Sequence, residues 1–505
     1  MKRGALNIAV VAAVMVLTFM GTRAYAADSY IGYAAGGYNG KLLIFGLPSL
    51  QLLKEVPAGV DLRGPVASGK KGNSNGLPDG KALYAVDKAA NKVVFFDMAT
   101  SAVSKSVPLP ARFGPSHLDL SSDGKSLCVA GELSGKIAKV DTASSKVDIV
   151  DLPMKPAAPV FAAITHDGAS CLVTDYINAV VWVVSMSPFK VEKSVPSGGN
   201  NPHGIAITPD NKWALISNKL SANMAFFDIA KKEVVKTIET SAVPIHTVID
   251  SKGQFAYQSA FLGNVITKVD LAKQAVVQMY DVQFRPGHLG ISPDDKFLFS
   301  LNKYSTGKFE KQGAKVGTGV VNPTNIEVID LASGKSVGHQ PVLGEPFGVV
   351  VASMSSVTDA SLKKGGKPFV SAGRAIDLPE KKGVKVTYGP AKPHKPGVVE
   401  VAGGSEIYIN AFSHQFAPNE IYVYEGDKIS IILQNIDEKG NMIDNADVVH
   451  GFVINGFADQ TQVLLPRGVA ATLEFSPDKT GTFDFYCSNF CGSAHMEMRG
   501  RFIVE

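Results

Sequence analysis

The stretch PDNKWALISNKLSANMAFFD, residues 209–228, consists of a polar turn, an apolar run, a second polar turn and another apolar run that ends in aspartate. The same order recurs at a period of about 40 residues, which is the mark of a stacked or radial repeat. The turns that open the copies begin at Pro78, Ser122, His166, Pro209, Ser251 and Pro293. The second runs end at Asp97, Asp141, Asp228, Asp270 and Asp330.

Short alternating strands at this spacing predict four-stranded propeller blades. The six copies and a partial unit at Tyr30–Val56 give seven blades, and the run Phe347–Ala352 would close the ring beside the first unit. A closed ring is favoured because it leaves only short, protected sheet edges. The alternative is an open solenoid, but no capping unit is evident at either end of the array.

Outward from the repeat, residues 354–398 lose the pattern and become rich in Lys, Gly and Pro, which predicts a linker. Alternation returns in residues 399–505, as expected of a small β-sandwich. The chain is therefore predicted to be all-β, with a seven-bladed β-propeller over residues 27–353 and a sandwich after the linker.

The N-terminus is typical of a signal peptide over residues 1–26. Lys2 and Arg3 precede the apolar run Ala5–Met20, and Ala24-Tyr25-Ala26 offers a cleavage site. An uncleaved membrane anchor is the alternative, although the run is short for a spanning helix. We expect a periplasmic mature protein that does not bind a membrane. With 19% charged residues and a net charge of +4, nothing indicates nucleic-acid binding.

The C-terminal stretch CSNFCGSAHMEM, residues 487–498, combines sulfur and imidazole groups in one loop after a predicted strand. Two cysteines four residues apart allow both thiolates to bridge a pair of coppers, and these soft ligands suit copper. The remaining ligands are expected to be His450, Asn489 (through its carbonyl oxygen), His495 and Met498. This set, with Cys487 and Cys491, predicts a dinuclear Cu-A centre that relays electrons.

Three alternatives compete for this motif. A disulfide between Cys487 and Cys491 is possible in an oxidising compartment, but it leaves His495 and Met498 without a role. Zinc sites normally use a second ligand pair and no methionine, and the C-x-x-C-H sequence of a c-type haem is absent. The other cysteines, Cys128 and Cys171, lie in apolar runs and are expected to be buried as small hydrophobes.

The segment His450–Glu505 resembles the Cu-A domain of nitrous-oxide reductase, and Cys487–Arg501 is similar almost letter for letter. Subunit II of haem-copper oxidases shares the ligand spacing but carries membrane helices and no propeller. The resemblance implies a cupredoxin-like sandwich, bound copper and a small periplasmic electron donor, either a cytochrome c or a cupredoxin. It also implies a head-to-tail homodimer and the family reaction, N2O + 2 e⁻ + 2 H⁺ giving N2 and water.

Four histidines follow a proline at the start of a predicted innermost strand, where side chains converge on the propeller axis. They are His117, His203, His246 and His288. Neutral imidazole suits copper, so these residues are a candidate copper site. The alternative is that each histidine only fills a polar position at its strand start.

The resemblance extends to these histidines, since His203, His246 and His288 stand in stretches similar to ligand stretches of the family's catalytic Cu-Z cluster. Phe161 and Phe347 stand where the family has two further ligand histidines, and about four of seven positions are kept. We therefore expect a copper oxidoreductase with one or two coppers in the propeller. The alternative is an electron-transfer or copper-binding protein without a catalytic metal there. The other histidines expected to lie outside any site are His166, His339, His394 and His414.

Overall fold

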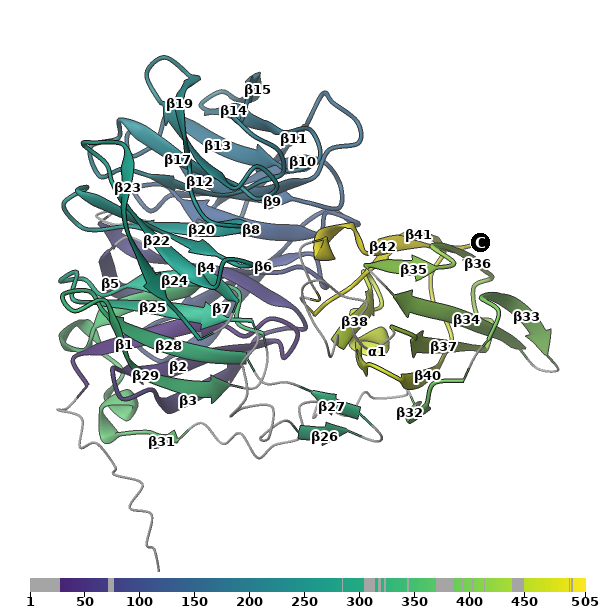
Figure 1. Cartoon of the computed structure of the whole chain (residues 1–505). Coiled ribbons are helices and arrows are strands. Elements are labelled where there is room, and N and C mark those ends of the chain that lie inside the picture. The colour runs from purple at the N-terminus through teal and green to yellow at the C-terminus, as the bar shows by residue number, and fades with distance from the viewer. Residues whose placement is uncertain are drawn as a thin grey trace, which may run out of the picture.

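The computed structural model describes most of the chain from residue 28 onward. The described residues are 28–70, 77–283, 285–303, 314–316, 319–321, 324–342, 345–368, 385–392, 394–401, 404–412, 414–437, 449–489, 491 and 494–505. The predicted signal peptide lies outside them. Strands dominate both parts of the molecule, a large propeller and a smaller sandwich at its side (Figure 1).

Seven separate antiparallel sheets form the propeller, and each contributes one blade. Blade one contains β30 (Val349–Ser353), β1 (Tyr30–Ala35), β2 (Lys41–Leu47) and β3 (Gln51–Pro57), and blade two contains β4 (Leu62–Lys70), β5 (Leu77–Asp87), β6 (Lys92–Asp97) and β7 (Ala102–Pro108). Blade three contains β8 (Pro115–Leu120), β9 (Ser126–Gly131), β10 (Lys136–Asp141) and β11 (Val147–Asp151), and blade four contains β12 (Pro159–Ile164), β13 (Ser170–Asp175), β14 (Val180–Met186) and β15 (Phe189–Pro196). Blade five contains β16 (Pro202–Ile207), β17 (Trp213–Asn218), β18 (Asn223–Asp228) and β19 (Glu233–Glu239), and blade six contains β20 (Pro244–Ile249), β21 (Phe255–Ala260), β22 (Val265–Asp270) and β23 (Ala275–Asp281). Blade seven contains β24 (Pro286–Ile291), β25 (Phe297–Asn302), β28 (Thr324–Asp330) and β29 (Lys335–Val342).

The ring closes where the two ends of the propeller pair. Strand β30 runs antiparallel to β1, with Ala352 opposite Ile31, so a strand from the end of the repeat completes the first blade. In Figure 1 the purple β1 and β2 accordingly lie beside the green β28 and β29. The predicted seven blades, the closing strand and the all-β class are confirmed.

The opening turns and the strand burial explain why the repeat folds this way. Each turn needs one residue with positive φ, which glycine adopts without strain, as at Gly124 (φ 73°). Asn211 (φ 58°) and Asp295 (φ 59°) take the same place in other copies, and short polar side chains tolerate this region best after glycine. The innermost strand β24 is buried throughout, whereas the outermost β19 is largely exposed, so the apolar content falls outward along each blade.

Cys128 on β9 and Cys171 on β13 form a disulfide between adjacent blades. The expectation that they are merely buried hydrophobes was wrong, although both are buried. Their separation of 43 residues is one short of the repeat offset between Asp123 and Asp167. Because alternate strand residues point to opposite faces, this difference of one turns the two side chains toward each other across the blade interface.

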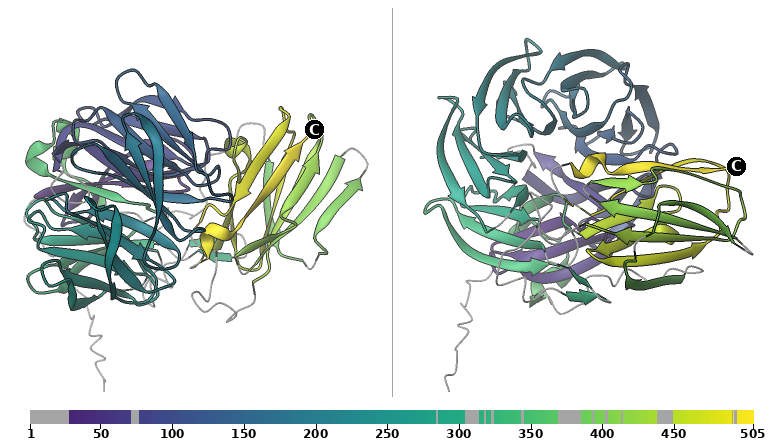
Figure 2. Two further views of the ribbon diagram at one scale, coloured as in Figure 1. Left: turned by 90° about the horizontal axis from the view of Figure 1, so that it is seen from above. Right: turned by 45° about the vertical axis from the view of Figure 1, so that its right-hand side comes forward.

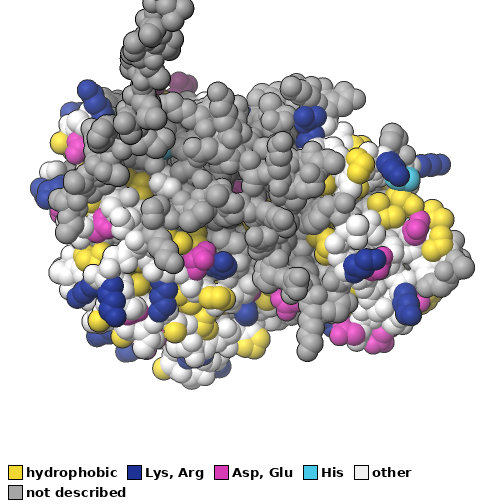
Figure 3. All heavy atoms as spheres, turned by 90° about the horizontal axis from the view of Figure 1, so that it is seen from below, with side chains coloured by type: hydrophobic (Ala, Val, Ile, Leu, Met, Phe, Trp, Pro, Cys, Tyr) yellow, Lys and Arg dark blue, Asp and Glu magenta, His cyan; other side chains and the backbone are white. Residues whose placement is uncertain are grey.

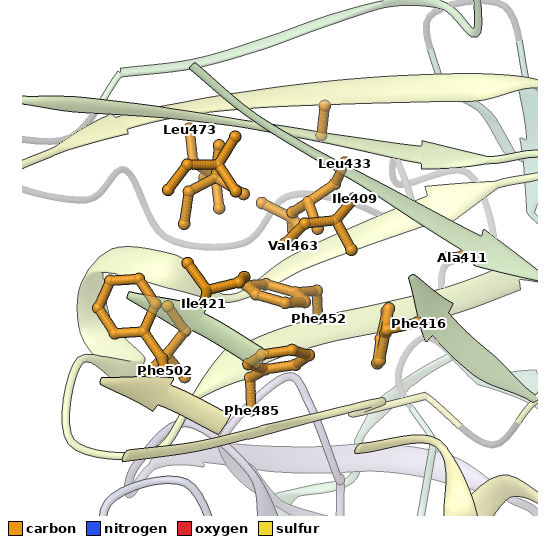
Figure 4. Close-up of a cluster of buried hydrophobic side chains, with 14 of the residues drawn as sticks. Ile409, Ala411, Phe416, Ile421, Leu433, Phe452, Val463, Leu473, Phe485 and Phe502 are labelled. Atoms are coloured by element: carbon orange, nitrogen blue, oxygen red, sulfur yellow. The ribbon is translucent and has the colours of Figure 1, made fainter. Parts of the chain in front are cut away.

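The C-terminal part is a sandwich of two sheets. The first sheet has the order β32 (Lys385–Pro390), β40 (Val469–Phe475), β37 (Ile429–Asn435), β34 (Gly404–Phe412) and β33 (Gly397–Val401), with β35 (Gln415–Ala417) paired to β34. The second has the order β36 (Glu420–Val423), β42 (Arg499–Val504), β41 (Gly481–Tyr486), β38 (Val449–Ile454) and β39 (Val463–Pro466). Between them lies an apolar core that includes Phe416, Phe452, Phe485 and Phe502 (Figure 4).

Short elements accompany the two parts. They are the hairpin β26 (Ala314–Val316) and β27 (Gly319–Val321), η2 (Met354–Ser356), η3 (Ala360–Lys364), β31 (Lys367–Pro368), α1 (Ala458–Thr461) and η4 (His495–Glu497). The segment predicted as a linker thus contributes β31, which pairs with β3, and β32 and the start of β33 in the sandwich. All three lie at sheet edges, where Lys, Gly and Pro are tolerated.

The sandwich lies directly against one side of the propeller (Figures 1 and 2). A small buried cluster spans the contact, with Val60 and Ala89 from the propeller and Val453, Ala458 and Tyr486 from the sandwich. Elsewhere on the surface, Lys and Arg side chains are interspersed with Asp and Glu over the described part of one face (Figure 3). In the part of the chain that the structure describes, no helix combines the length and apolarity needed to cross a bilayer.

Candidate metal centre

The two loop cysteines lie side by side at the end of β41. Cys487 Sγ is 3.7 Å from Cys491 Sγ, both side chains are buried, and neither is in a disulfide. The Cys487 backbone N–H donates to the Met498 carbonyl oxygen, which holds the returning end of the loop against its start. The loop therefore presents two sulfur atoms at a spacing at which one metal pair could contact both.

His450 on β38 completes a group of three candidate ligands. Its nitrogen and the sulfur atoms of Cys487 and Cys491 all lie within 4.8 Å of one another. His450 Nε2 is 2.6 Å from Asp437 Oδ2, whereas Nδ1 is buried without a hydrogen-bond partner. A buried nitrogen without a partner is costly. A carboxylate that holds the far nitrogen of an imidazole is the usual support of a metal-bound histidine.

The other predicted ligand groups surround the sulfur pair. His495 Nδ1 lies 3.7 Å from Cys491 Sγ, and Met498 Sδ lies 3.8 Å from the same sulfur. The Asn489 carbonyl oxygen lies 2.9 Å from Cys487 Sγ, at the opposite side of the pair. The structure thus brings all six predicted groups together, with methionine at one sulfur and the carbonyl at the other.

The electrostatics of the site favour one thiolate and disfavour a second beside it. Burial raises the pKa of Cys487, but the neighbouring Cys491, His450 and His495 outweigh it and bring that pKa well below its usual range. Burial and the neighbouring Cys487 raise the pKa of Cys491 well above its usual range. Burial lowers the pKa of His450, yet the hydrogen bond to Asp437 and the nearby charge of Cys487 raise it to about 9. The metal-free site therefore holds one thiolate and resists a second, so a metal cation has to displace the proton of Cys491, and this donor set fits copper.

The surroundings exclude water from the sulfur atoms. Cys487, Cys491 and Met498 belong to the same buried cluster of the sandwich as Phe452 and Phe485. Figure 4 shows the two phenylalanines in this core. The Gly451 backbone N–H donates to Cys487 Sγ at 3.3 Å, a contact that a side chain at this position would obstruct, because an added Cβ would lie 2.6 Å from Asn489 N. The site is thus rigid and apolar, with few donors to the sulfur atoms.

Sequence reasoning missed Asp437. It stands in the unremarkable stretch Asn435-Ile436-Asp437 directly after β37, and its role depends on how the two sheets pack, because β37 belongs to the first sheet and β38 to the second. A carboxylate directly after a predicted strand of the same domain was the available signal, but without the packing of the two sheets it could not be assigned to one histidine.

The propeller histidines do gather at the axis, on the first strands β8, β16, β20 and β24. His117 Nε2 and His288 Nε2 are 3.2 Å apart, and the His246 and His288 ring centroids are 5.1 Å apart. Burial holds the pKa of His246 at about 4 and those of the other three well below the usual range, so the imidazoles are neutral. His117, His246 and His288 line a cavity of about 70 Å³, whereas His203 does not.

Phe161 occupies the middle of this group. Its ring stacks on His117 at a centroid distance of 3.7 Å and lies 5.1, 5.7 and 5.9 Å from the rings of His203, His246 and His288. The centroid of the Phe347 ring lies 5.7 Å from the centroid of the His288 ring. Among the described residues, the only group of three or more His, Cys, Asp or Glu ligand atoms within 4.8 Å is the one around Cys487. A four-copper cluster therefore does not fit the propeller pocket.

Hydrogen bonds assign different roles to the four imidazoles. His203 Nδ1 lies 3.1 Å from the Ile245 carbonyl oxygen and donates to it, which leaves a lone pair on Nε2. His246 Nδ1 instead accepts from the Leu289 backbone N–H at 3.2 Å, so its Nε2 carries the proton. His246 is thus a donor in the pocket, whereas His203 retains a nitrogen suited to a metal, and the Nε2 atoms of His117 and His288 face each other at 3.2 Å.

Comparisons with known proteins agree with the two-part architecture. A family model described as "Lactonase, 7-bladed beta-propeller" matches residues 73–247, and one described as "Cupredoxin-like domain" matches residues 391–504. A crystal structure of a functionally unknown protein from Desulfotomaculum acetoxidans superposes with a TM-score of 0.52 at 14% identity, covering 64% of this chain and 99% of that one. That likeness shows the fold alone.

Curated relatives include nitrous-oxide reductases. The enzyme of Stutzerimonas stutzeri is 22% identical over an alignment covering 95% of this chain and 89% of the relative. That of Pseudomonas fluorescens is 26% identical over 60% of this chain, which spans about half (49%) of that relative's length. Cytochrome c oxidase subunit 2 of Thermus thermophilus is 28% identical over 20% of this chain and 64% of the relative. The resemblance to nitrous-oxide reductases is thus confirmed along almost the whole chain.

Proposed function

We propose that this chain is an exported copper oxidoreductase of the nitrous-oxide-reductase type, whose C-terminal domain binds a dinuclear Cu-A centre. A small periplasmic donor, a cytochrome c or a cupredoxin, supplies the electrons. The centre relays them toward the propeller pocket. The homology with nitrous-oxide reductases and with cytochrome c oxidase subunit 2 supports this class of function.

One observation carries the proposal. Two free, buried sulfur atoms 3.7 Å apart are flanked by the Nδ1 atoms of two histidines, and His450 Nδ1 has no protein partner. A disulfide would leave that nitrogen without a partner, and a single zinc ion would not need both a methionine sulfur and a carbonyl at opposite sides of the pair. When bound, a copper pair shared by two thiolates supplies a one-electron couple delocalised over two ions.

The residues of this chain prepare the site for such a couple. Asp437 holds the Nε2 proton of His450 and so directs Nδ1 at the sulfur atoms. The loop is fixed by the apolar packing and by the hydrogen bond from the Cys487 backbone N–H to the Met498 carbonyl oxygen. The ligand positions therefore change little between oxidation states. A rigid, dry site keeps the reorganisation that accompanies electron transfer small.

For the propeller we propose at most one copper, between His117 and His288. Their Nε2 atoms are 3.2 Å apart, and two imidazole nitrogens at about 2 Å from one ion can lie at this separation. Phe161 fills the space that a larger cluster would need. We therefore do not expect the protein to reduce nitrous oxide, and an assay of the copper-loaded protein with a reduced dye should show no turnover.

Copper counting tests both parts of the proposal. The wild type should hold three coppers per chain, Cys491→Ser should lose the copper pair, and His288→Ala should lose only the propeller copper. His339→Ala, at an exposed histidine, is the matched control and should retain all three. Two coppers in the wild type would instead support the electron-transfer protein without a propeller metal, and none would refute the proposed function.

The mutation His203→Ala separates the two sites by spectrum. It should leave the mixed-valence spectrum of the copper pair unchanged and weaken the propeller copper, because His203 Nε2 is the third imidazole nitrogen left with a lone pair. If His203→Ala changes neither copper content nor electron transfer, the propeller site is wrong.

A further inference from the structure

The propeller cavity continues beyond the histidines that line it. It has a volume of about 70 Å³ and follows β12 from Phe161, beside the histidines, to Ile164 at the end of the strand and to His166 in the turn that follows. Three residues of a strand span about 10 Å. The cavity is therefore a passage along the propeller axis and not only a pocket at the histidines.

The far end of this passage reaches solvent. Asp119 and His166 line it there, and both are partly exposed. His166 was expected to lie outside any site, yet it borders this mouth, where its Nδ1 donates to the Pro209 carbonyl oxygen at 3.3 Å. The Asp119 carboxylate accepts from the Ile164 backbone N–H at 2.7 Å and so joins blades three and four at the mouth. Two neighbouring blades thus fix the width of the opening.

The wall of the passage is largely apolar and carries little charge. Its apolar lining includes Leu118, Ala163, Ile164, Ala206, Ile207 and Val349. Among the described residues, no Lys or Arg lines the cavity, and Asp119 is the only carboxylate that does. Burial lowers the pKa of His246 to about 4, so its ring is uncharged at neutral pH. An ion without a partner is costly in such surroundings, and the carboxylate at the mouth also repels anions.

One hydrogen-bond donor lies near the inner end of the passage. His246 lines the cavity and is partly exposed, although the rest of β20 is buried. Its Nδ1 accepts from the Leu289 backbone N–H, so its Nε2–H is left to donate. One water needs about 10 to 15 Å³ of such space, so the cavity has room for a molecule of roughly five non-hydrogen atoms.

We infer that the propeller cavity is an entry channel for small uncharged molecules, which it binds through a hydrogen bond from His246 Nε2. These molecules have up to about five non-hydrogen atoms, one of which accepts a hydrogen bond. Their entry lies at the end of the propeller away from Val60 and Ala89, which belong to the contact with the sandwich. The channel does not depend on copper, whereas its use by a reaction rests on the proposed function.

Thiol labelling tests the channel with two reagents of nearly the same size. Ala163→Cys places a thiol in the cavity wall, and Ala214→Cys places one in the same apolar cluster but outside the wall. Iodoacetamide is uncharged, and iodoacetate carries a carboxylate in place of the amide. With either reagent the thiolate sulfur forms a bond to carbon and iodide leaves. Ala230→Cys, in an exposed turn, supplies the rate for an accessible thiol. Peptide mass spectrometry reads each cysteine separately, including Cys487 and Cys491.

Two comparisons give the expected result. Iodoacetamide should label Ala163→Cys at least roughly 100-fold faster than Ala214→Cys, because the enclosed thiol reacts only when the blade opens. The ratio of the iodoacetamide rate to the iodoacetate rate should be at least roughly tenfold higher at Ala163→Cys than at Ala230→Cys, since the channel disfavours charge. Each ratio is taken at one cysteine, so differences in thiol acidity cancel. Ala206→Cys in the wall and Ala256→Cys outside it form a second pair within another cluster.

The same rates can overturn the inference. If the wall cysteine and its control are labelled equally slowly in both pairs, the cavity is an enclosed void and no channel exists. If the two reagents give the same ratio in the wall as in the exposed turn, the channel does not select uncharged molecules.

Acetamide, which does not alkylate thiols, tests the hydrogen bond from His246. It should slow the labelling of Ala163→Cys by iodoacetamide in a saturable manner. His246→Leu in that background should raise the acetamide concentration needed roughly three- to tenfold, since one hydrogen bond is lost, and His246→Gln should restore most of the protection. Absent protection, or equal protection without the donor, would refute the binding role of His246.

Copper is counted in the same samples, which keeps this inference apart from the proposed function. Selective labelling in protein that binds no copper would refute the proposed function and support the channel. Unselective labelling in protein with its full copper content would do the reverse.

Discussion

Replacing Asp437 tests whether His450 is a supported metal ligand. Its carboxylate lies 2.6 Å from His450 Nε2, and both side chains are almost fully buried. In Asp437→Ala, Nε2 loses its acceptor, and the imidazole becomes a weaker and less well oriented ligand. Loss of such support costs about 10- to 100-fold in metal affinity, which is about 1.4 to 2.8 kcal/mol. Asp437→Asn keeps an acceptor but no charge, so its loss of metal affinity should be near the lower figure, about 10-fold.

The assay is competition for copper against a chelator of known affinity, with the visible spectrum recorded at each step. Asp459→Ala, an exposed carboxylate of the same domain, is the control and should bind copper as the wild type does. We expect weaker binding and a less symmetric mixed-valence spectrum in the Asp437 variants. If Asp437→Ala matches the control in both affinity and spectrum, His450 is not held for a metal and the reasoning fails.

Three further predictions address the propeller. Replacing Cys128 and Cys171 by serine should lower the free energy of unfolding by about 2 to 4 kcal/mol, because the disulfide no longer restricts the unfolded chain; an unchanged urea midpoint would contradict this. Phe161→His should raise the copper content of the pocket, whereas Phe161→Leu should not, and equal metal contents would show that the phenyl ring is not what limits the pocket. Burial raises the pKa of Tyr33, so the unfolded state loses that proton first as the pH rises above 10.0, and stability should fall there by about 1.4 kcal/mol per pH unit. Tyr33→Phe should remove this part of the fall in stability with pH. If the free energy of unfolding of Tyr33→Phe and of the wild type fell with the same slope above pH 10.0, the prediction would be wrong.

The sequence predicted the features that depend on local pattern. The turn residues and the strand period sufficed for seven blades, and the spacing from Cys487 to Met498 sufficed to gather a ligand set in one loop. The four histidines could be placed at the axis because each begins an innermost strand. In each case, the repeat or the loop itself fixes the relative positions of the residues.

The features that were missed depend on packing between distant segments. Asp437 reaches His450 only through the packing of the two sheets of the sandwich, and the Cys128–Cys171 bond depends on a register difference of one residue between neighbouring blades. Tyr486 faces the propeller because the whole sandwich is placed there by contacts up to 425 residues apart in sequence. The histidine positions were foreseen, but the stacking of Phe161 on His117 was not, since only the folded pocket shows which ring fills its middle.

The central claim is that Cys487 and Cys491 share one electron between two copper ions. Electron spin resonance of the purified, copper-replete wild type tests it most directly. We predict hyperfine splitting from two equivalent copper nuclei, lost in Cys491→Ser. A spectrum of isolated single coppers, together with a mass that shows Cys487 bonded to Cys491, would contradict the account.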